Sequence, residues 1–262
     1  MGCKTAASHF NTMSLIQKFQ RKSLPVHPLS NLPDGFTVYQ LADTGVSVME
    51  NFCTQQEANM LIRKAADKLR PSGITIEGSA SITDYRVSDT ASVFDFETKD
   101  TELLPFLERG AMLLGLPYAN VESVNVTRYR EGGYYRGHDD AYPGVYGDRL
   151  YTILVFLNTV PEENGGGTMF SKLRIAAQPK ACRAISWINR DADGSNHDES
   201  NHAALPVIGD AEKWVIQLWY RSYAVCGEAS SQIEIPITTG SPVTPETTLP
   251  DGVSYHSPAN SP

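Results

Sequence analysis

The segment best suited to chemistry is a histidine followed two residues later by an aspartate, His138 and Asp140. In an extended segment, side chains i and i+2 point to the same side, roughly 6.6 Å apart at about 3.3 Å per residue. Both could then reach one metal ion while Asp139 faces away. Two histidines and a carboxylate form the facial triad of non-haem iron oxygenases, which leaves other coordination positions open. The pattern predicts such a site, to be completed by a second imidazole from a distant strand.

Two later histidines, His197 and His202, could supply that imidazole, and both precede the last long β-rich run. Other interpretations exist, because a short H-x-D pattern also occurs as a polar pair on a surface turn. Two histidines and a carboxylate suit zinc as well, which would make the chain a zinc hydrolase. The order of elements downstream favours the iron site: a glycine turn leads into a strand at 165–170, and a lysine and two tryptophans follow His202.

Two amphipathic helices should precede the strands that hold these residues. Thr54 and Glu57 form a capping-box pattern, and apolar residues then recur at helical spacing over 54–70. A second helix is expected to begin near residue 100, with Pro105 tolerated near its first turn, and to end before Gly115.

Short β-rich runs follow. We expect strands at 121–130, 150–159, 168–170, 174–176, 181–188, 203–207 and 213–223. Many short strands with glycine-rich turns are typical of a jelly roll or barrel. The predicted fold is mainly β with flanking α: a double-stranded β-helix core of jelly-roll or cupin-like type, packed against N-terminal helices.

Composition divides the chain into three parts. Residues 1–33 are weakly patterned, 34–230 form one domain, and 231–262 read as a flexible tail rich in proline, serine and threonine. The 22 basic and 30 acidic side chains leave a net charge of −8, which disfavours nucleic acid as a partner. Apolar runs near twenty residues are absent from the sequence, so we expect no membrane span.

The cysteines and the N-terminal composition indicate a compartment. The four cysteines form no C-x-x-C pair, which argues against a structural zinc site and a disulfide scaffold. The first thirty residues contain no apolar run typical of a secretory signal. A reducing, cytoplasmic location is therefore expected.

Over about residues 48–223 the chain resembles the prolyl 4-hydroxylase-like branch of the 2-oxoglutarate and iron(II)-dependent dioxygenases. The motifs that carry the resemblance are Arg86-Val-Ser88, Arg128-Tyr129, Gly132-Gly133, the H-x-D pair, Gly165-Gly166-x-Thr168-x-Phe170 and the closing His202, Lys213 and Trp214 series. The resemblance implies Fe(II), 2-oxoglutarate as cosubstrate, O2, and ascorbate as reductant.

It also implies roles for individual residues. The catalytic metal ligands fall on His138, Asp140 and His202, since the Ala-Ala-x-Pro-Val context follows His202 and not His197. The cosubstrate residues fall on Lys213, Tyr129 and Thr168. Positions that line the prolyl-peptide groove of the family fall on Tyr135, Arg149, Trp219 and Arg221, and an arginine at 221 departs from the residue type that relatives often carry.

Lys213 stands eleven residues past His202, one more than the family's usual spacing, and it opens the aromatic-rich run Lys213–Tyr220. An inward-pointing charge there would be costly unless it met an anion. This favours a pair between its ammonium and the distal carboxylate of 2-oxoglutarate.

The resemblance implies hydroxylation of an unactivated C–H bond, foremost of a prolyl residue in a peptide, with release of succinate and CO2. Two alternatives stay open. A tailoring oxygenase could hydroxylate, desaturate or cyclise a free amino acid or small metabolite, because Arg149 and Arg221 could bind a carboxylate. A cupin-like protein could also bind a metal without turnover.

Overall fold

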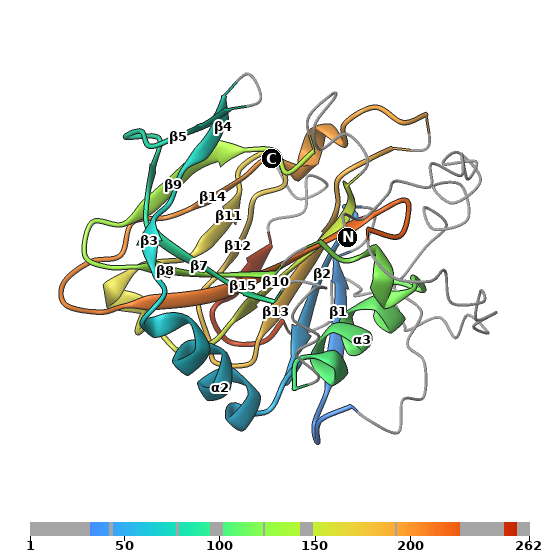
Figure 1. The fold of residues 1–262 in the computed structure, drawn as a ribbon, viewed down its shortest axis with the longest axis horizontal. Helices are drawn as coiled ribbons and strands as arrows, with labels where there is room; N and C mark the ends of the chain where they lie inside the picture. Colours follow the sequence, from blue (N-terminus) through green and yellow to red (C-terminus); the bar gives the residue numbers. More distant parts are fainter. Residues whose placement is uncertain are drawn as a thin grey trace, which may run out of the picture.

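A computed structural model describes the chain over residues 32–41, 44–76, 79–94, 102–122, 124–141, 149–191, 193–225 and 249–255. Its core is two facing β-sheets with two helices on one side (Figure 1). The predicted class, mainly β with flanking α and a jelly-roll core, is confirmed.

The major sheet contains eight antiparallel strands. In spatial order they are β1 (Thr37–Leu41), β2 (Val46–Glu50), β13 (Ala184–Ile188), β10 (Arg149–Phe156), β15 (Lys213–Arg221), β8 (Val124–Tyr129), β7 (Asp89–Phe94) and β3 (Arg70–Pro71). All eight residues of β10 are buried. A strand buried on both faces must be covered twice, here by the second sheet and by the helices.

The minor sheet contains six strands, again antiparallel. In spatial order they are β16 (Val253–Tyr255), β12 (Ile175–Ala177), β11 (Thr168–Phe170), β14 (His202–Ala204), β9 (Tyr134–His138) and β6 (Arg86–Val87). A separate hairpin joins β4 (Ile74–Ile76) and β5 (Ser79–Ser81). Apolar side chains of the two sheets interdigitate in a shared core, which includes Leu154, Phe156, Phe170, Ile175 and Trp187.

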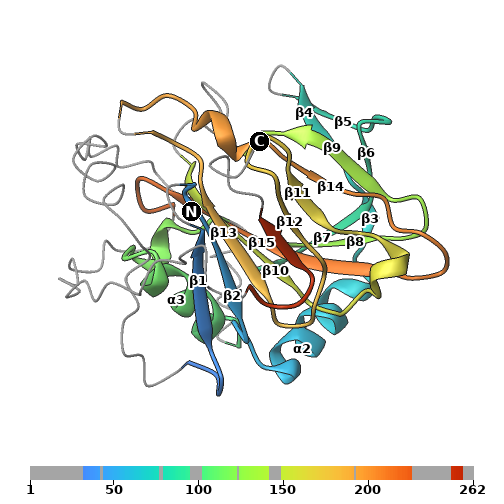
Figure 2. The ribbon, with the colours of Figure 1, turned by 180° about the vertical axis from the view of Figure 1, so that it is seen from behind.

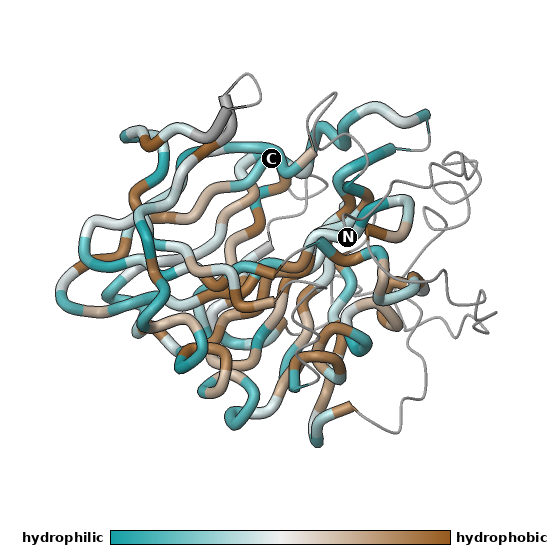
Figure 3. The backbone as a smooth tube through the Cα atoms, in the orientation of Figure 1, coloured by the Kyte–Doolittle hydropathy of each residue, from teal (hydrophilic) through white to brown (hydrophobic). Residues whose placement is uncertain are grey.

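The two helices cover the other face of the major sheet, away from β9, β11 and β14 (Figures 1 and 2). Helix α2 (Gln55–Ala66) begins with the predicted capping box between Thr54 and Glu57. Helix α3 (Leu104–Leu113) accommodates its proline in the first turn, as expected. A second apolar core lies between these helices and the sheet. In Figure 3 hydrophobic positions concentrate along the central strands and the inner helix faces.

The order of elements differs from the prediction that both helices precede the strands. β1 and β2 come before α2, and β3 to β7 lie between α2 and α3. These early strands are two to six residues long and half exposed in places, so they give little periodic signal in the sequence.

The predicted flexible tail also contains structure. Within it, β16 adds to the edge of the minor sheet by pairing with β12 (Figure 2). Arg183 donates to the Asp251 carbonyl at 2.6 Å, and Leu249 and Val253 pack against the core between the sheets. Residues 249–255 therefore pack against the domain, although composition assigns them to a flexible tail, because composition does not reveal such long-range contacts.

Two buried cysteines that are distant in sequence come together in the fold. Cys53 precedes α2, and the backbone carbonyl of Cys182 accepts a hydrogen bond from the backbone amide of Phe52 at 2.8 Å. A hydrogen bond to the Cys182 thiol, together with burial, raises the pKa of Cys53. Both thiols are free.

Neither helix in the described part of the chain has the length and apolar content needed to cross a membrane.

Candidate metal centre

The H-x-D segment lies at the end of β9, on the inner face of the minor sheet. His138 is the last residue of the strand, and Asp140 follows two residues later, with both side chains buried. The Asp139 carboxylate instead accepts a hydrogen bond from Asn201 at 3.0 Å, away from the other two. The alternation expected for an extended segment therefore holds across the strand end.

The second imidazole belongs to His202, which lies directly opposite His138 in the pairing of β14 with β9. One nitrogen or oxygen from each of His138, Asp140 and His202 lies within 4.8 Å of the others. His197 is elsewhere: its Nδ1 lies 2.7 Å from Asp191 Oδ1. The structure thus brings together the three residues that the family resemblance singled out and leaves His197 apart.

The donor set fits a divalent metal. The Nδ1 atoms of His138 and His202 hydrogen bond to the backbone carbonyls of Arg136 and Ser200, at 2.9 and 2.8 Å. Each Nδ1 must carry the proton, because a carbonyl only accepts. In a neutral ring of this tautomer Nε2 carries the lone pair, and both Nε2 atoms are buried without a hydrogen-bond partner. Two orphaned imidazole lone pairs beside a carboxylate are the arrangement that a metal ligand set requires.

Electrostatics keep the triad in its metal-binding protonation state. Burial, reinforced by the neighbouring His202, lowers the pKa of His138 to about 3, so its ring is neutral at physiological pH. Burial alone would raise the pKa of Asp140, but His202, His138 and Arg149, together with a hydrogen bond from Thr152, lower it overall. A neutral imidazole facing an ionised carboxylate needs no deprotonation before metal binds.

Aromatic rings fix the orientation of both imidazoles. Tyr135 stacks on His138 with centroids 3.5 Å apart and an angle of 16° between the planes. Phe170 and Trp187 pack against His202, with centroid distances of 5.5 and 4.4 Å. Tyr135, predicted as a substrate residue, therefore lies against the metal site itself.

A buried cation lies on the inner face of β15. Lys213 is 1% exposed, and its Nζ lies 3.4 Å from Thr168 Oγ1 and 5.1 Å from the Tyr129 ring centroid. No carboxylate within the described residues forms an ion pair with it. Burial lowers the pKa of Lys213 to about 7. Lys213, Tyr129 and Thr168, the three predicted cosubstrate residues, thus surround one position suited to an anion.

Arg86, on the edge strand β6 of the minor sheet, lies near Tyr129. Its guanidinium donates to hydroxyls of Ser88, Thr90 and Thr127 at 2.9 to 3.2 Å and lies 4.8 Å from the Tyr135 ring centroid. Burial raises the pKa of the Tyr129 hydroxyl, while Arg86 opposes that rise. Strands β6 and β7 lie on either side of Ser88, the first of these hydroxyl partners.

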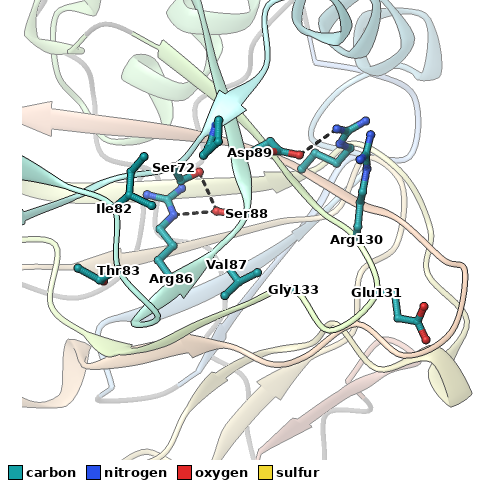
Figure 4. A pocket seen from close by; sticks show the side chains of 12 residues that line it. Ser72, Ile82, Thr83, Arg86, Val87, Ser88, Asp89, Arg130, Glu131 and Gly133 are labelled. Atoms are coloured by element: carbon teal, nitrogen blue, oxygen red, sulfur yellow. Dashed lines mark hydrogen bonds and ion pairs between the residues drawn. The ribbon is translucent and has the colours of Figure 1, made fainter.

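A cavity of about 320 Å³ adjoins this arginine on the outside (Figure 4). Arg86 and Ser88 face one another across its rim, and Ser88 also hydrogen bonds to Ser72 (Figure 4). The exposed side chains of Ile82 and Val87 line the same cavity. Arg86 contacts Tyr135, which stacks on His138, so this arginine connects the lining of the cavity with the surroundings of the metal site.

A charged cluster occupies the other end of the inner sheet face. Glu122 accepts two hydrogen bonds from Arg149 and one from Arg221, all at 2.7 Å. The Arg149 guanidinium also lies 4.1 Å from the Trp219 ring centroid and donates to the Asp140 backbone carbonyl at 3.1 Å. Three of the predicted substrate residues, Arg149, Trp219 and Arg221, therefore lie together. Glu122, which joins the two arginines, was missed because it lies outside any recognisable motif.

Two more neighbours of the metal site were missed. Thr152 donates to Asp140 Oδ2 at 2.7 Å, and Asn189 donates to Thr152 at 2.9 Å. The period-2 alternation of the β10 run predicts that Thr152 shares a face with Leu154 and Phe156, but that pattern does not mark a hydroxyl as special.

Comparison with known proteins agrees with this geometry. Residues 124–221, which contain all three ligand candidates, match the model of the 2OG-Fe(II) oxygenase superfamily. The chain is 30% identical over 238 residues to prolyl 4-hydroxylase subunit alpha-3 of Rattus norvegicus, covering 84% of this chain but 42% of the rat subunit. It is 29% identical over 220 residues to prolyl 4-hydroxylase 13 of Arabidopsis thaliana, covering 76% of this chain and 75% of the plant protein.

A solved structure is similar in fold. The viral collagen prolyl hydroxylase of Paramecium Bursaria Chlorella virus-1, in complex with 2-oxoglutarate, superimposes with a TM-score of 0.55 at 26% identity. The similarity covers 68% of this chain and 96% of the viral one. The fold, the triad of ligand candidates and these similarities agree: the chain is similar to the 2-oxoglutarate and Fe(II)-dependent oxygenases, and among them to prolyl 4-hydroxylases.

Proposed function

We propose that the chain is an Fe(II)- and 2-oxoglutarate-dependent dioxygenase that hydroxylates prolyl residues in a peptide or protein. The observation that carries the proposal is the buried triad of His138, Asp140 and His202, with two unpartnered imidazole nitrogens, together with the buried Lys213, which forms no ion pair with a carboxylate of the described residues. When bound, Fe(II) and 2-oxoglutarate supply the oxidising chemistry, in which O2 is consumed, succinate and CO2 form, and a substrate C–H bond becomes C–OH.

The chain's own residues bind and orient these groups. His138, Asp140 and His202 would hold Fe(II), with each imidazole locked by its Nδ1 hydrogen bond. Lys213 would form an ion pair with the distal carboxylate of 2-oxoglutarate, helped by the hydroxyls of Thr168 and Tyr129. Such an anion would neutralise a buried charge that otherwise has a large desolvation cost. The apolar core between the sheets excludes water from this end of the site.

The substrate would approach from the opposite end. β15 runs from Lys213 at the cosubstrate end to Arg221 at the charged cluster, eight residues later, or roughly 26 Å at about 3.3 Å per residue. Thr152, which bonds Asp140, lies opposite Trp219, two residues before Arg221. The metal site thus lies along the strand between the two ends. Tyr135, Arg149, Trp219 and Arg221 are our proposed substrate residues.

A second candidate is a tailoring oxygenase that acts on a free amino acid or small acid. The cluster favours it because two guanidiniums, those of Arg149 and Arg221, bring their positive charge together around Glu122 near the metal site. A substrate carboxylate would complement that charge.

The test is aerobic incubation of the full chain with Fe(II), 2-oxoglutarate and ascorbate, which we propose as the reductant. Mass spectrometry would follow proline-containing peptides, free amino acids and small acids for a gain of one oxygen. Oxygenated peptide together with stoichiometric succinate supports prolyl hydroxylation. Oxygenation confined to small acids supports the second candidate. Failure of every substrate to stimulate 2-oxoglutarate turnover, with metal bound, would favour a cupin-like protein without turnover.

We also propose a cytoplasmic location, supported by the two adjacent free thiols Cys53 and Cys182. Partners other than the peptide or small-molecule substrate are not proposed, and the net charge of −8 argues against nucleic acid.

A further inference from the structure

The carboxylate of Asp140 is held by a buried chain of two polar side chains. Thr152 donates its hydroxyl to Asp140 Oδ2 at 2.7 Å, and the Asn189 amide donates to the Thr152 hydroxyl at 2.9 Å. Thr152 is fully buried, and Asn189 and Asp140 are 1% and 4% exposed. Hydrogen bonds in such an environment are stronger than in water and costly to leave unmade.

The direction of the two hydrogen bonds, from Asn189 to Thr152 and from Thr152 to Asp140, follows from the chemistry of the three side chains. An ionised carboxylate only accepts, and a threonine hydroxyl has a single proton to donate. If the Asn189 amide presented its oxygen to Thr152, that proton would have two acceptors to serve and one carboxylate oxygen would lose its donor. Only the order Asn189 to Thr152 to Asp140 gives each contact one donor and one acceptor.

The backbone around this chain holds both donors in place. Thr152 lies on the central strand β10, opposite Trp187 on β13 and Trp219 on β15. Asn189 immediately follows β13. Its backbone amide donates to the Leu150 carbonyl at 2.9 Å, and its backbone carbonyl accepts a hydrogen bond from the His197 backbone amide at 3.0 Å. Thr152 is therefore held within a central strand, and Asn189 is held by backbone hydrogen bonds directly after a strand.

We propose that Thr152 is a positioning residue for the metal centre, and that Asn189 orients Thr152. The Thr152 hydroxyl fixes Oδ2 of Asp140 and with it the plane of the carboxylate, whose Oδ1 lies 3.7 Å from His138 Nε2 and whose Oδ2 lies 3.9 Å from His202 Nε2. A free carboxylate could rotate and present either oxygen or both. This inference rests on the proposed metal site and extends it to two residues that contact no ligand themselves.

Cobalt(II) binding to the metal-free full chain, without oxygen or 2-oxoglutarate, tests the inference independently of catalysis. Thr152→Val keeps the shape of the side chain and removes the donor, whereas Thr152→Ser keeps the donor and removes a methyl. We expect Thr152→Val to weaken cobalt binding about 10- to 100-fold and to change the visible absorption of the bound ion, as loss of an outer-sphere partner does. Thr152→Ser should stay within about threefold of the wild type.

Asn189→Leu removes the orienting amide but keeps the Thr152 hydroxyl, so we expect a smaller loss of cobalt affinity than in Thr152→Val. Circular dichroism of each metal-free variant verifies folding. Thr152→Ala replaces Thr152→Val if the latter does not fold, with the same expectation.

Equal cobalt affinity and identical spectra in the wild type and Thr152→Val would overturn the inference. Equal losses in Thr152→Val and Thr152→Ser would also overturn it, because packing rather than hydrogen bonding would then explain them. A wild-type chain that binds no cobalt would refute the metal site of the proposed function, a result that is distinct from loss in the variants alone.

Discussion

Lys213 and Tyr129 face each other across β15 and β8, with the Lys213 ammonium 5.1 Å from the centre of the Tyr129 ring. Cross-strand partners on one face of a sheet lie close enough to act on a common ligand. With Thr168 contributing a hydroxyl from the opposite sheet, two sheets enclose one cation. These are the surroundings that the proposed carboxylate site of 2-oxoglutarate requires.

Replacing Lys213 by alanine should raise the KM for 2-oxoglutarate by about one to two orders of magnitude. A charge-assisted hydrogen bond contributes about 1.5–3 kcal/mol, which corresponds to that range. The measurement is succinate formation at varied 2-oxoglutarate, with Lys213→Arg as the variant that keeps the charge. An unchanged KM in Lys213→Ala would assign the cosubstrate carboxylate to another cation, such as Arg86.

Binding of 2-oxoglutarate should weaken as the pH rises above 7. Burial lowers the pKa of Lys213 to about 7, so the ammonium that binds the carboxylate is lost above this value and must be re-protonated on binding. The apparent Kd should rise by up to about tenfold per pH unit between pH 7.5 and 9. Titration of the Mn(II)-loaded protein measures it. Lys213→Arg should show a flat profile, because guanidinium stays protonated, and equal slopes in both proteins would contradict the assignment.

Asp140→Ala should abolish succinate formation coupled to hydroxylation. The two imidazoles would lose their anionic partner, and a carboxylate is an obligatory member of the facial triad. Isothermal titration with Co(II) should show loss of tight binding. Asp139→Ala is the matched control, since that carboxylate bonds Asn201 instead, and it should keep tight cobalt binding. Full activity in Asp140→Ala would remove the ligand assignment.

Arg221→Ala should act on the substrate and not on the cosubstrate. Arg221 bonds Glu122 at the opposite end of β15 from Lys213. We expect kcat/KM for the oxygenated substrate to fall about tenfold or more, the loss typical of one charge-assisted contact, while the KM for 2-oxoglutarate stays the same. Parallel assays of the two parameters distinguish this result from general destabilisation, which would lower the amount of active enzyme without such a split.

Removing residues 249–262 should destabilise the domain more than removing only 256–262. The longer truncation deletes β16, the carbonyl of Asp251 that accepts from buried Arg183, and the apolar contacts of Leu249 and Val253. We expect a loss of about 2–3 kcal/mol, or roughly 4–12 °C in Tm for a domain of this size. Thermal unfolding by circular dichroism compares the two. Equal Tm values would show that β16 contributes little.

Local patterns in the sequence predict much of this protein. The Thr54–Glu57 capping box marks the start of α2, because it depends only on residues three apart. The strands that carry Thr168 and Lys213 follow from short β-rich runs. β9, which ends at His138, is not among the expected strands, and β14 begins at His202, one residue before the run expected at 203–207. The H-x-D spacing places His138 and Asp140 on one side of a strand end, since alternation is a property of the extended backbone itself.

Other features required the assembled fold. Spacing alone leaves two candidates for the third ligand; the family resemblance selects His202, and the register of β14 against β9 is what brings His202 opposite His138 while His197 binds Asp191. The pairing of Glu122 with two arginines, the chain from Asn189 through Thr152 to Asp140, and the edge strand β16 all join residues tens to about a hundred positions apart. Strand register and sheet order decide such contacts, and these arise from the burial of whole faces, which no local pattern encodes.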